Sequence, residues 1–321
     1  MALPALGVLP LGIYGMVMGL TGLGLAWRAA GAPAWVSEPW IFLGAVAFAL
    51  LAALHVAKLW RYPRAVLAEL RAAPLLGFCG AIPVALSLVS AGLAPHAVPI
   101  AATLWWIAYA LHLAFMAGGV ARWLAGMKLA ELNPGWIILM VGGIVVPLGG
   151  LTLGYVQAAA WLFAASVALA PAVMGLVAWR AASAPPLPEA ARPTWFVLLA
   201  PPMLLYINGP EVWAPGPWID AAFLGGLLLW LWLLWFARRF ARWPFSMAWW
   251  AFTFPLDAVA SAAWRYADAH AAPLWRGLAW AALALATIAV LLVGARTLAA
   301  LRAGTLFAPP PMPRSAASPR G

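Results

Sequence analysis

Three side chains able to act on a solute lie on one face of the segment at residues 247–261. Phe254, Asp257 and Ser261 follow one another at steps of three and four, which is the spacing of one helix face. Pro255 kinks a helix and directs the ring before it away from the helix wall. A ring in a narrow apolar bore blocks water and ions. Two interpretations stay open: Phe254 is a gate, or it is one of thirteen packed phenylalanines.

Asp257 allows several interpretations. A charge inside a membrane helix is a functional hypothesis by default. A carboxylate lining a pore would repel any permeant anion, so Asp257 fits an anion pore less well than its neighbours do. It could instead bond to a neighbouring helix, or carry a proton in coupled transport.

The elements that must position these residues are membrane helices. Of the 321 residues, 66% are hydrophobic and only 8% are charged, which is too little charge to cover a water-facing surface. Apolar runs long enough to cross a bilayer recur along the chain. We predict an all-α integral membrane protein whose ten helices form five hairpins at residues 8–27, 39–60, 75–93, 98–121, 135–153, 156–179, 194–212, 218–237, 246–266 and 274–300. The first run lacks the order of a cleaved signal peptide, so we interpret it as a retained span.

The distribution of basic residues orients these helices. The chain has 18 Lys and Arg residues, and all but Arg28, Arg265 and Arg276 follow an even-numbered helix or lie in the C-terminal end. Basic residues gather in cytoplasmic loops, so both termini are predicted to be cytoplasmic. The net charge of +10 has the same origin and does not require a nucleic-acid partner. We predict one transmembrane domain at residues 1–302 and a disordered, Pro- and Ser-rich cytoplasmic tail at residues 303–321.

Odd and even helices differ in their proline content. Proline occurs inside the third, fifth, seventh and ninth helices, and among the even helices only Pro171 is internal. Because a kinked helix needs neighbours or water to satisfy its freed backbone groups, we expect the odd helices to form an inner five-helix pore. Several odd helices have one face made of small or hydroxyl-bearing residues, which supports the pore, although close packing between helices would produce such faces too. The pore-lining candidates are Gly15, Gly19, Pro83, Ser87, Gly143, Pro147, Pro202, Pro255, Asp257 and Ser261.

No residue pattern supports an enzyme or a resident cofactor. Cys79 is the single cysteine, and neither a phosphate-binding loop nor a catalytic triad occurs. His55 and His112 lie on separate even helices, so we predict neither a metal nor a cofactor site. A membrane-embedded haem or sensory module that uses His112 is the third hypothesis, and a haem absorbance would reveal it.

Several segments resemble the tellurite-resistance/dicarboxylate transporter family, which includes the slow anion channels of plants and the yeast malate permeases. The similarity runs from about residue 8 to 300 and is most specific in the aromatic ninth segment, MAWWAFTFPLDAVAS, and in Ala-Pro-Pro at residues 200–202. LPLGIYGMVMG at residues 9–19 and VGGIVVP at residues 141–147 match more weakly. The resemblance implies ten helices in five hairpins, an inner pore closed by Phe254, and a homotrimer in bacteria.

The leading hypothesis is therefore an anion channel of the slow-anion-channel type in a bacterial inner membrane. Its partners would be the lipid bilayer and small inorganic or dicarboxylate anions. The alternatives are a proton-coupled C4-dicarboxylate carrier that uses Asp257 and a transporter for tellurite- or sulfite-type oxyanions.

Overall fold

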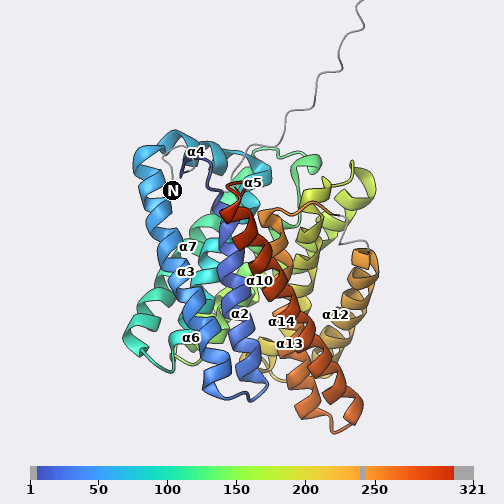
Figure 1. Cartoon of the computed structure of the whole chain (residues 1–321). Helices are drawn as coiled ribbons and strands as arrows, with labels where there is room; N and C mark the ends of the chain where they lie inside the picture. Colours follow the sequence, from blue (N-terminus) through green and yellow to red (C-terminus); the bar gives the residue numbers. More distant parts are fainter. Residues whose placement is uncertain (1–5, 239–242, 307–321) are drawn as a thin grey trace, which may run out of the picture.

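The computed structural model describes residues 6–238 and 243–306, and this part of the chain is helical with no strand. The tail at residues 307–321, and with it most of the predicted disordered segment, lies outside the described residues. The long helices on the outside are α3 (Ala34–Arg61), α7 (Val98–Leu124), α10 (Val156–Ser183), α12 (Pro217–Phe236) and α14 (Pro273–Arg302). Between them in the sequence lie shorter or broken helical segments (Figure 1).

These broken segments fall where proline and glycine interrupt the predicted odd helices. The first is η1 (Leu11–Tyr14) continued by α2 (Gly15–Ala29), and the second is α5 (Ala73–Cys79) followed by α6 (Ala81–Leu93). The third consists of α8 (Gly135–Val141), η3 (Gly142–Val145) and α9 (Pro147–Gly150). The fourth is η4 (Glu189–Leu199) with α11 (Ala200–Val212), and the fifth is η6 (Met247–Trp249) with α13 (Trp250–Ala269). Proline adjoins two of the breaks, at Pro147, where α9 begins, and at Pro201, near the start of α11, because it lacks the N–H that a helix interior needs. In contrast, α13 continues through Pro255.

Seven segments in the described residues are long and apolar enough to cross a membrane. Five of them are the outer helices, and the other two are α5 with α6 and η4 with α11. Three predicted spans fall short for identifiable reasons: α2 has 15 residues, the segment at residues 135–150 is broken, and α13 carries Asp257, Arg265 and Asp268. The protein is an all-α, multi-pass membrane protein, and the count of ten spans stays a prediction.

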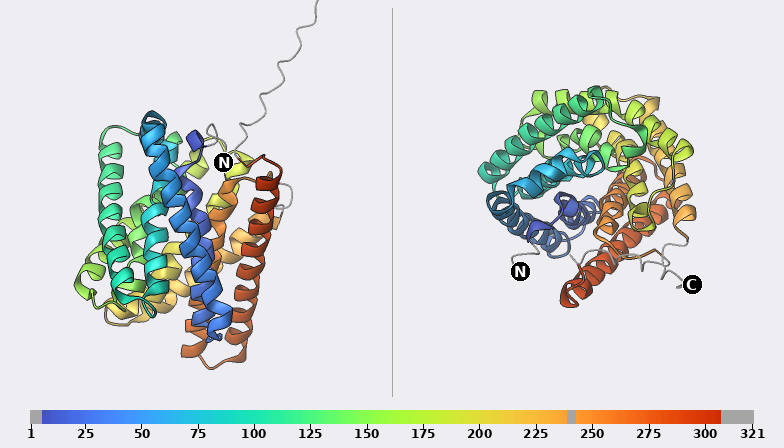
Figure 2. Two further views of the ribbon diagram at one scale, coloured as in Figure 1. Left: turned by 60° about the vertical axis from the view of Figure 1, so that its left-hand side comes forward. Right: turned by 90° about the horizontal axis from the view of Figure 1, so that it is seen from above.

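Contacts between the elements arrange the broken segments in a ring. Each packs on the outer helix that follows it: α2 on α3, α6 on α7, α8 on α10, α11 on α12, and α13 on α14. The broken segments also contact one another in a closed cycle, from α2 to α6, through η3 to α11, and through α13 back to α2. Seen from above, the chain follows this circle from its beginning to its end (Figure 2).

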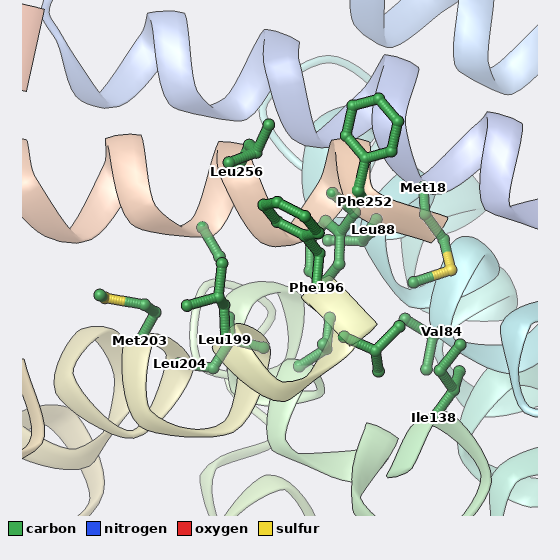
Figure 3. Packing of buried hydrophobic residues seen from close by; sticks show 14 of the residues in the cluster. Met18, Val84, Leu88, Ile138, Phe196, Leu199, Met203, Leu204, Phe252 and Leu256 are labelled. Atoms are coloured by element: carbon green, nitrogen blue, oxygen red, sulfur yellow. The ribbon is translucent and has the colours of Figure 1, made fainter. Parts of the chain in front are cut away.

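Burial separates the two sets of helices. Large apolar side chains such as Trp35, Trp60, Leu228 and Trp235 are exposed on the outer helices, as a lipid-facing surface requires. The core lies among the broken segments, where side chains from α2, α6, α8, η4, α11 and α13 pack together (Figure 3). The inner elements are thus enclosed by protein, and they position the residues of interest.

One element was not predicted. Helix α4 (Pro63–Arg71) follows α3 directly and has no buried residue. It lies across the end of the bundle at which η1 begins and α14 ends (Figure 1). Its charged residues interrupt the apolar pattern, so the sequence alone suggested a loop here.

Candidate pore and gate

Two cavities lie inside the ring of broken segments. The first, of about 340 Å³, is lined by residues of all five broken segments and by Glu69 of α4. Its described lining is almost wholly apolar, and Glu69 is the one charged residue in it. It lies toward the end of the bundle that carries α4, because Val8, Leu75 and Met247 line it.

The second cavity, of about 330 Å³, lies toward the opposite end and is more polar. Arg28, Asp257 and Arg265 line it, together with Thr152 and Ser261. Arg28 and Arg265 are cationic, so the second cavity attracts anions through a positive charge that the lining of the first cavity lacks.

Phe254 and Leu204 separate the two cavities, since both residues line each of them. Phe254 is only 5% exposed and comes from α13, where Pro255 follows it inside the helix. Gly22 of α2 makes room for it: a Cβ added at Gly22 would lie 2.8 Å from Cδ2 of Phe254. The ring therefore lies against α2 and borders both cavities.

Asp257 lies one turn beyond Phe254 and is 1% exposed. Neither carboxyl oxygen has a hydrogen-bond partner among the described residues. Ser261 does not supply one, since its hydroxyl donates to the backbone oxygen of Asp257 at 2.9 Å. The interhelical hydrogen bond considered from the sequence is thus missing in the described part of the chain, and the carboxyl lines the second cavity.

The two arginines of the second cavity are held in place by neighbours. Arg28 forms two 2.8 Å contacts with the carboxylate of Glu38, and its guanidinium donates to the Gly92 carbonyl at 3.1 Å. Glu38 also lies 2.8 Å from His96. Arg265 donates to the Ile207 carbonyl at 2.7 Å. These contacts fix both cations beside the cavity.

At the other end, Glu69 bridges three segments of the chain. One of its carboxylate oxygens lies 2.5 Å from the ammonium of Lys58 on α3. The other accepts a hydrogen bond of 3.2 Å from the backbone N–H of Leu11 in η1. Lys58 is fully buried and donates a further hydrogen bond of 2.6 Å to the Leu9 carbonyl.

The predicted lining residues divide into two groups. Gly15 and Pro255 line the first cavity, Asp257 and Ser261 line the second, and Phe254 lines both. The remaining candidates line neither of these two cavities: Gly19, Pro83, Ser87, Gly143, Pro147 and Pro202.

Close packing accounts for several members of the second group. Gly19 lies against Thr253 of α13, and a Cβ at Gly143 would lie 2.8 Å from Leu162 of the outer helix α10. Pro202 faces α12, within 3.3 Å of a Cβ added at Gly226. Phe252, two residues before Phe254, packs on Phe196 of η4, with ring centroids 5.8 Å apart, and lines neither cavity.

Leu204, Glu69 and the two arginines were not among the predicted lining residues. Leu204 carries no distinguishing sequence signal. Arg265 had one, because it continues the Asp257 and Ser261 face at a further step of four. No group of three or more His, Cys, Asp and Glu side chains able to hold a metal ion occurs in the described residues.

The ring of inner helices, the apolar exterior and the interrupted central hollow define a class: a helical membrane protein built around a path for small solutes. Comparison with known proteins gives the family. The family model described as SLAC1, voltage-dependent anion channel, matches residues 9–298, so the chain belongs to this family of anion channels and transporters, which are not enzymes.

The curated proteins similar to this chain are channels or transporters by name. The S-type anion channel SLAH2 of Arabidopsis thaliana is 25% identical over 278 residues, which cover 81% of this chain and 53% of the relative. SLAH3 of the same plant is 21% identical over 88% of the chain and 46% of the relative. The uncharacterized transporter MJ0576 of Methanocaldococcus jannaschii is 29% identical over 41% of the chain and 45% of the relative. The chain spans about half the length of the curated relatives that it matches.

Proposed function

We propose that this chain is an anion channel whose central path in each protomer is closed by Phe254. The observation that carries the proposal is that Phe254, with Leu204, lines both cavities and lies between them. Movement of one aromatic ring would join two hollows of similar size into a continuous path. Apolar constrictions stop ions by excluding water, so a ring here suits a gate.

The expected ions are small and weakly bound. The described residues that line the first cavity include no cation, and the arginines of the second cavity are already paired with protein groups. Weak binding suits conduction, because an ion must leave as readily as it enters. Small inorganic anions are therefore favoured over tightly held substrates.

The membrane arrangement is part of the proposal. The short inner segments would cross the bilayer inside the ring of outer helices, which gives ten spans in a single domain. Because most basic residues lie at the α4 end, that end would face the cytoplasm, together with both termini. Family resemblance favours a homotrimer in a bacterial inner membrane. The mass of the purified protein in lipid nanodiscs would test the trimer.

A carrier is the second candidate. Its supporting observation is Asp257, which lines the second cavity beside the gate and whose two carboxyl oxygens have no hydrogen-bond partner among the described residues. Such a group could exchange a proton with a C4-dicarboxylate or another oxyanion. This candidate requires saturable malate or succinate uptake that depends on a proton gradient and is lost in Asp257→Asn. Normal uptake by that variant across a range of pH would exclude it.

The channel is tested by nitrate efflux from proteoliposomes. We expect Phe254→Ala to raise the efflux rate about tenfold or more, since lowering a barrier by about 1.4 kcal/mol multiplies a rate tenfold. The matched control is Phe252→Ala, which removes a ring of equal size and equal burial that lines neither cavity. Equal efflux from wild type and Phe254→Ala would remove the gate assignment.

A further inference from the structure

The contact between Glu69 and Lys58 is unusual for the mouth of an anion path, because a carboxylate stands where anions would enter. The Glu69 carboxylate lies between two hydrogen-bond donors, the Lys58 ammonium at 2.5 Å and the Leu11 N–H at 3.2 Å. Glu69 also lines the first cavity. The negative charge of Glu69 is thus paired with the positive charge of Lys58, which is fully buried.

An ammonium and a backbone N–H that point at the same place can bind an anion through two hydrogen bonds. That anion need not be a carboxylate of the same chain. A small oxyanion has the same acceptor atoms and could accept from both donors. Lys58 needs an anionic partner in any state, because an unpaired buried charge is strongly unfavourable.

The element that carries Glu69 is suited to release it. Helix α4 has nine residues and buries none of them. Leu70 packs on the core but is only partly buried, so side-chain packing holds α4 less firmly than the inner helices, and the Glu69 carboxylate links it to η1 and α3. Segments with few buried contacts open at low free-energy cost.

We propose that Lys58 and the Leu11 N–H form an anion-binding site at the mouth of the first cavity, which Glu69 fills until a small oxyanion takes its place. The occupant would be a monovalent oxyanion of the size of nitrate. Its role at the entrance of a path rests on the proposed channel function, whereas the binding itself does not. Exchange of Glu69 for the ion would free α4 from η1 and α3.

Thermal unfolding of the purified protein in detergent tests the binding without any transport. Glu69→Gln removes the carboxylate that pairs with Lys58, so the buried ammonium then requires an anion from solution. At constant ionic strength, replacing sodium gluconate by sodium nitrate should raise the Tm of Glu69→Gln by about 2–4 °C more than that of wild type. Gluconate serves as the reference because its carboxylate could bind only if its polyol chain also entered the almost wholly apolar first cavity.

Two further variants identify the site. Glu131→Gln removes an exposed acid elsewhere, one that lies 3.9 Å from Arg122, and should respond to nitrate as wild type does. Lys58→Met combined with Glu69→Gln removes the ammonium as well and should abolish the nitrate response. If Glu69→Gln does not fold in either salt, Glu69→Asp takes its place in the experiment. The shorter side chain moves the carboxylate away from Lys58, so nitrate should raise the Tm of Glu69→Asp more than that of wild type.

The results separate the two proposals. A nitrate response no larger in the Glu69 variants than in wild type overturns the site, whatever the liposome assays show. A response that persists in the double variant also overturns it, because the ion then binds elsewhere. If the site passes this test but neither wild type nor Phe254→Ala releases nitrate from liposomes, the channel fails and the anion site stands.

Discussion

Gly22 on α2 lies directly against Phe254 on α13, and it contacts Asp257 at the same time. A Cβ at Gly22 would lie 2.8 Å from Cδ2 of Phe254 and 2.7 Å from Oδ2 of Asp257. Both distances are below van der Waals contact, so the space left by the missing side chain is filled by the candidate gate and the carboxyl beside it. The position of the ring thus depends on a residue in another helix.

Gly22→Ala should therefore displace the Phe254 ring and raise nitrate efflux from proteoliposomes, in the same direction as Phe254→Ala but by less. Gly175→Ala is the matched control, because nothing lies within 4 Å of a Cβ at Gly175. The control should leave efflux unchanged and stabilise its helix by up to about 1 kcal/mol. Unaltered efflux in Gly22→Ala would mean that the ring does not depend on α2.

Leu204 is the second side chain between the cavities, so Leu204→Ala should also raise efflux. If Leu204 and Phe254 close the same constriction, the effects are not independent, and the double variant should conduct less than the product of the two single effects. The truncation should also lower the free energy of unfolding by about 2–5 kcal/mol.

Leu205→Ala is the control for this cycle, because Leu205 lines neither cavity. It should be destabilising without raising efflux. Independent, multiplicative effects of Leu204→Ala and Phe254→Ala would place the two residues at separate barriers.

The sequence predicts the outer layer of this fold well and the inner layer only in outline. The predicted segments at residues 98–121 and 218–237 match α7 (Val98–Leu124) and α12 (Pro217–Phe236) closely, because lipid contact requires a long uninterrupted apolar run. The segment at residues 135–153 is instead three short pieces. Once a helix is enclosed by protein, Gly and Pro can break it, and hydropathy no longer fixes its limits.

The site was less predictable because glycine has two uses. Missing side chains make room either for a path or for a neighbouring helix, and the sequence does not distinguish them. Gly15 lines the first cavity, whereas Gly19, one turn further on, packs against Thr253. Glu69 could not be found from the pattern either, since its contact with Leu11 spans 58 positions in the chain.

Asp257 should limit the stability of the protein. Both of its oxygens are buried with no hydrogen-bond partner in the part of the chain that the structure describes, and burial of an unsatisfied polar group is unfavourable. Asp257→Leu keeps a similar shape and should raise the free energy of unfolding by about 1–3 kcal/mol. Denaturation followed by intrinsic tryptophan fluorescence in detergent measures the change.

Asp268→Asn provides the comparison on the same helix. Asp268 is exposed and lies 3.3 Å from Arg276, so its replacement should change stability by less than about 1 kcal/mol. A loss of stability in Asp257→Leu would show that the carboxyl has partners in solution, such as bound water.

Arg265 should attract anions to the second cavity through its charge. It lines that cavity and is partly exposed, so its field acts on ions before they reach the gate. Salt screens such a field: the Debye length is about 30 Å at 0.01 M and about 3 Å at 1 M. Arg265→Gln should therefore lower nitrate efflux several-fold in dilute salt and leave it nearly unchanged in concentrated salt. Both measurements are best made in a Phe254→Ala background, where entry rather than the gate sets the rate.

The control for this prediction is Arg276→Gln, which removes an equal charge at the same end of the bundle from a residue that lines neither cavity. It should have a smaller effect at every salt concentration. Glutamine is two bonds shorter than arginine, so the hydrogen bond to the Ile207 carbonyl is removed together with the charge, and the comparison of dilute with concentrated salt separates the two effects. An equal reduction in dilute and concentrated salt would show that Arg265 acts by holding α11 and α13 together, because salt screens a short hydrogen bond much less than a long-range field.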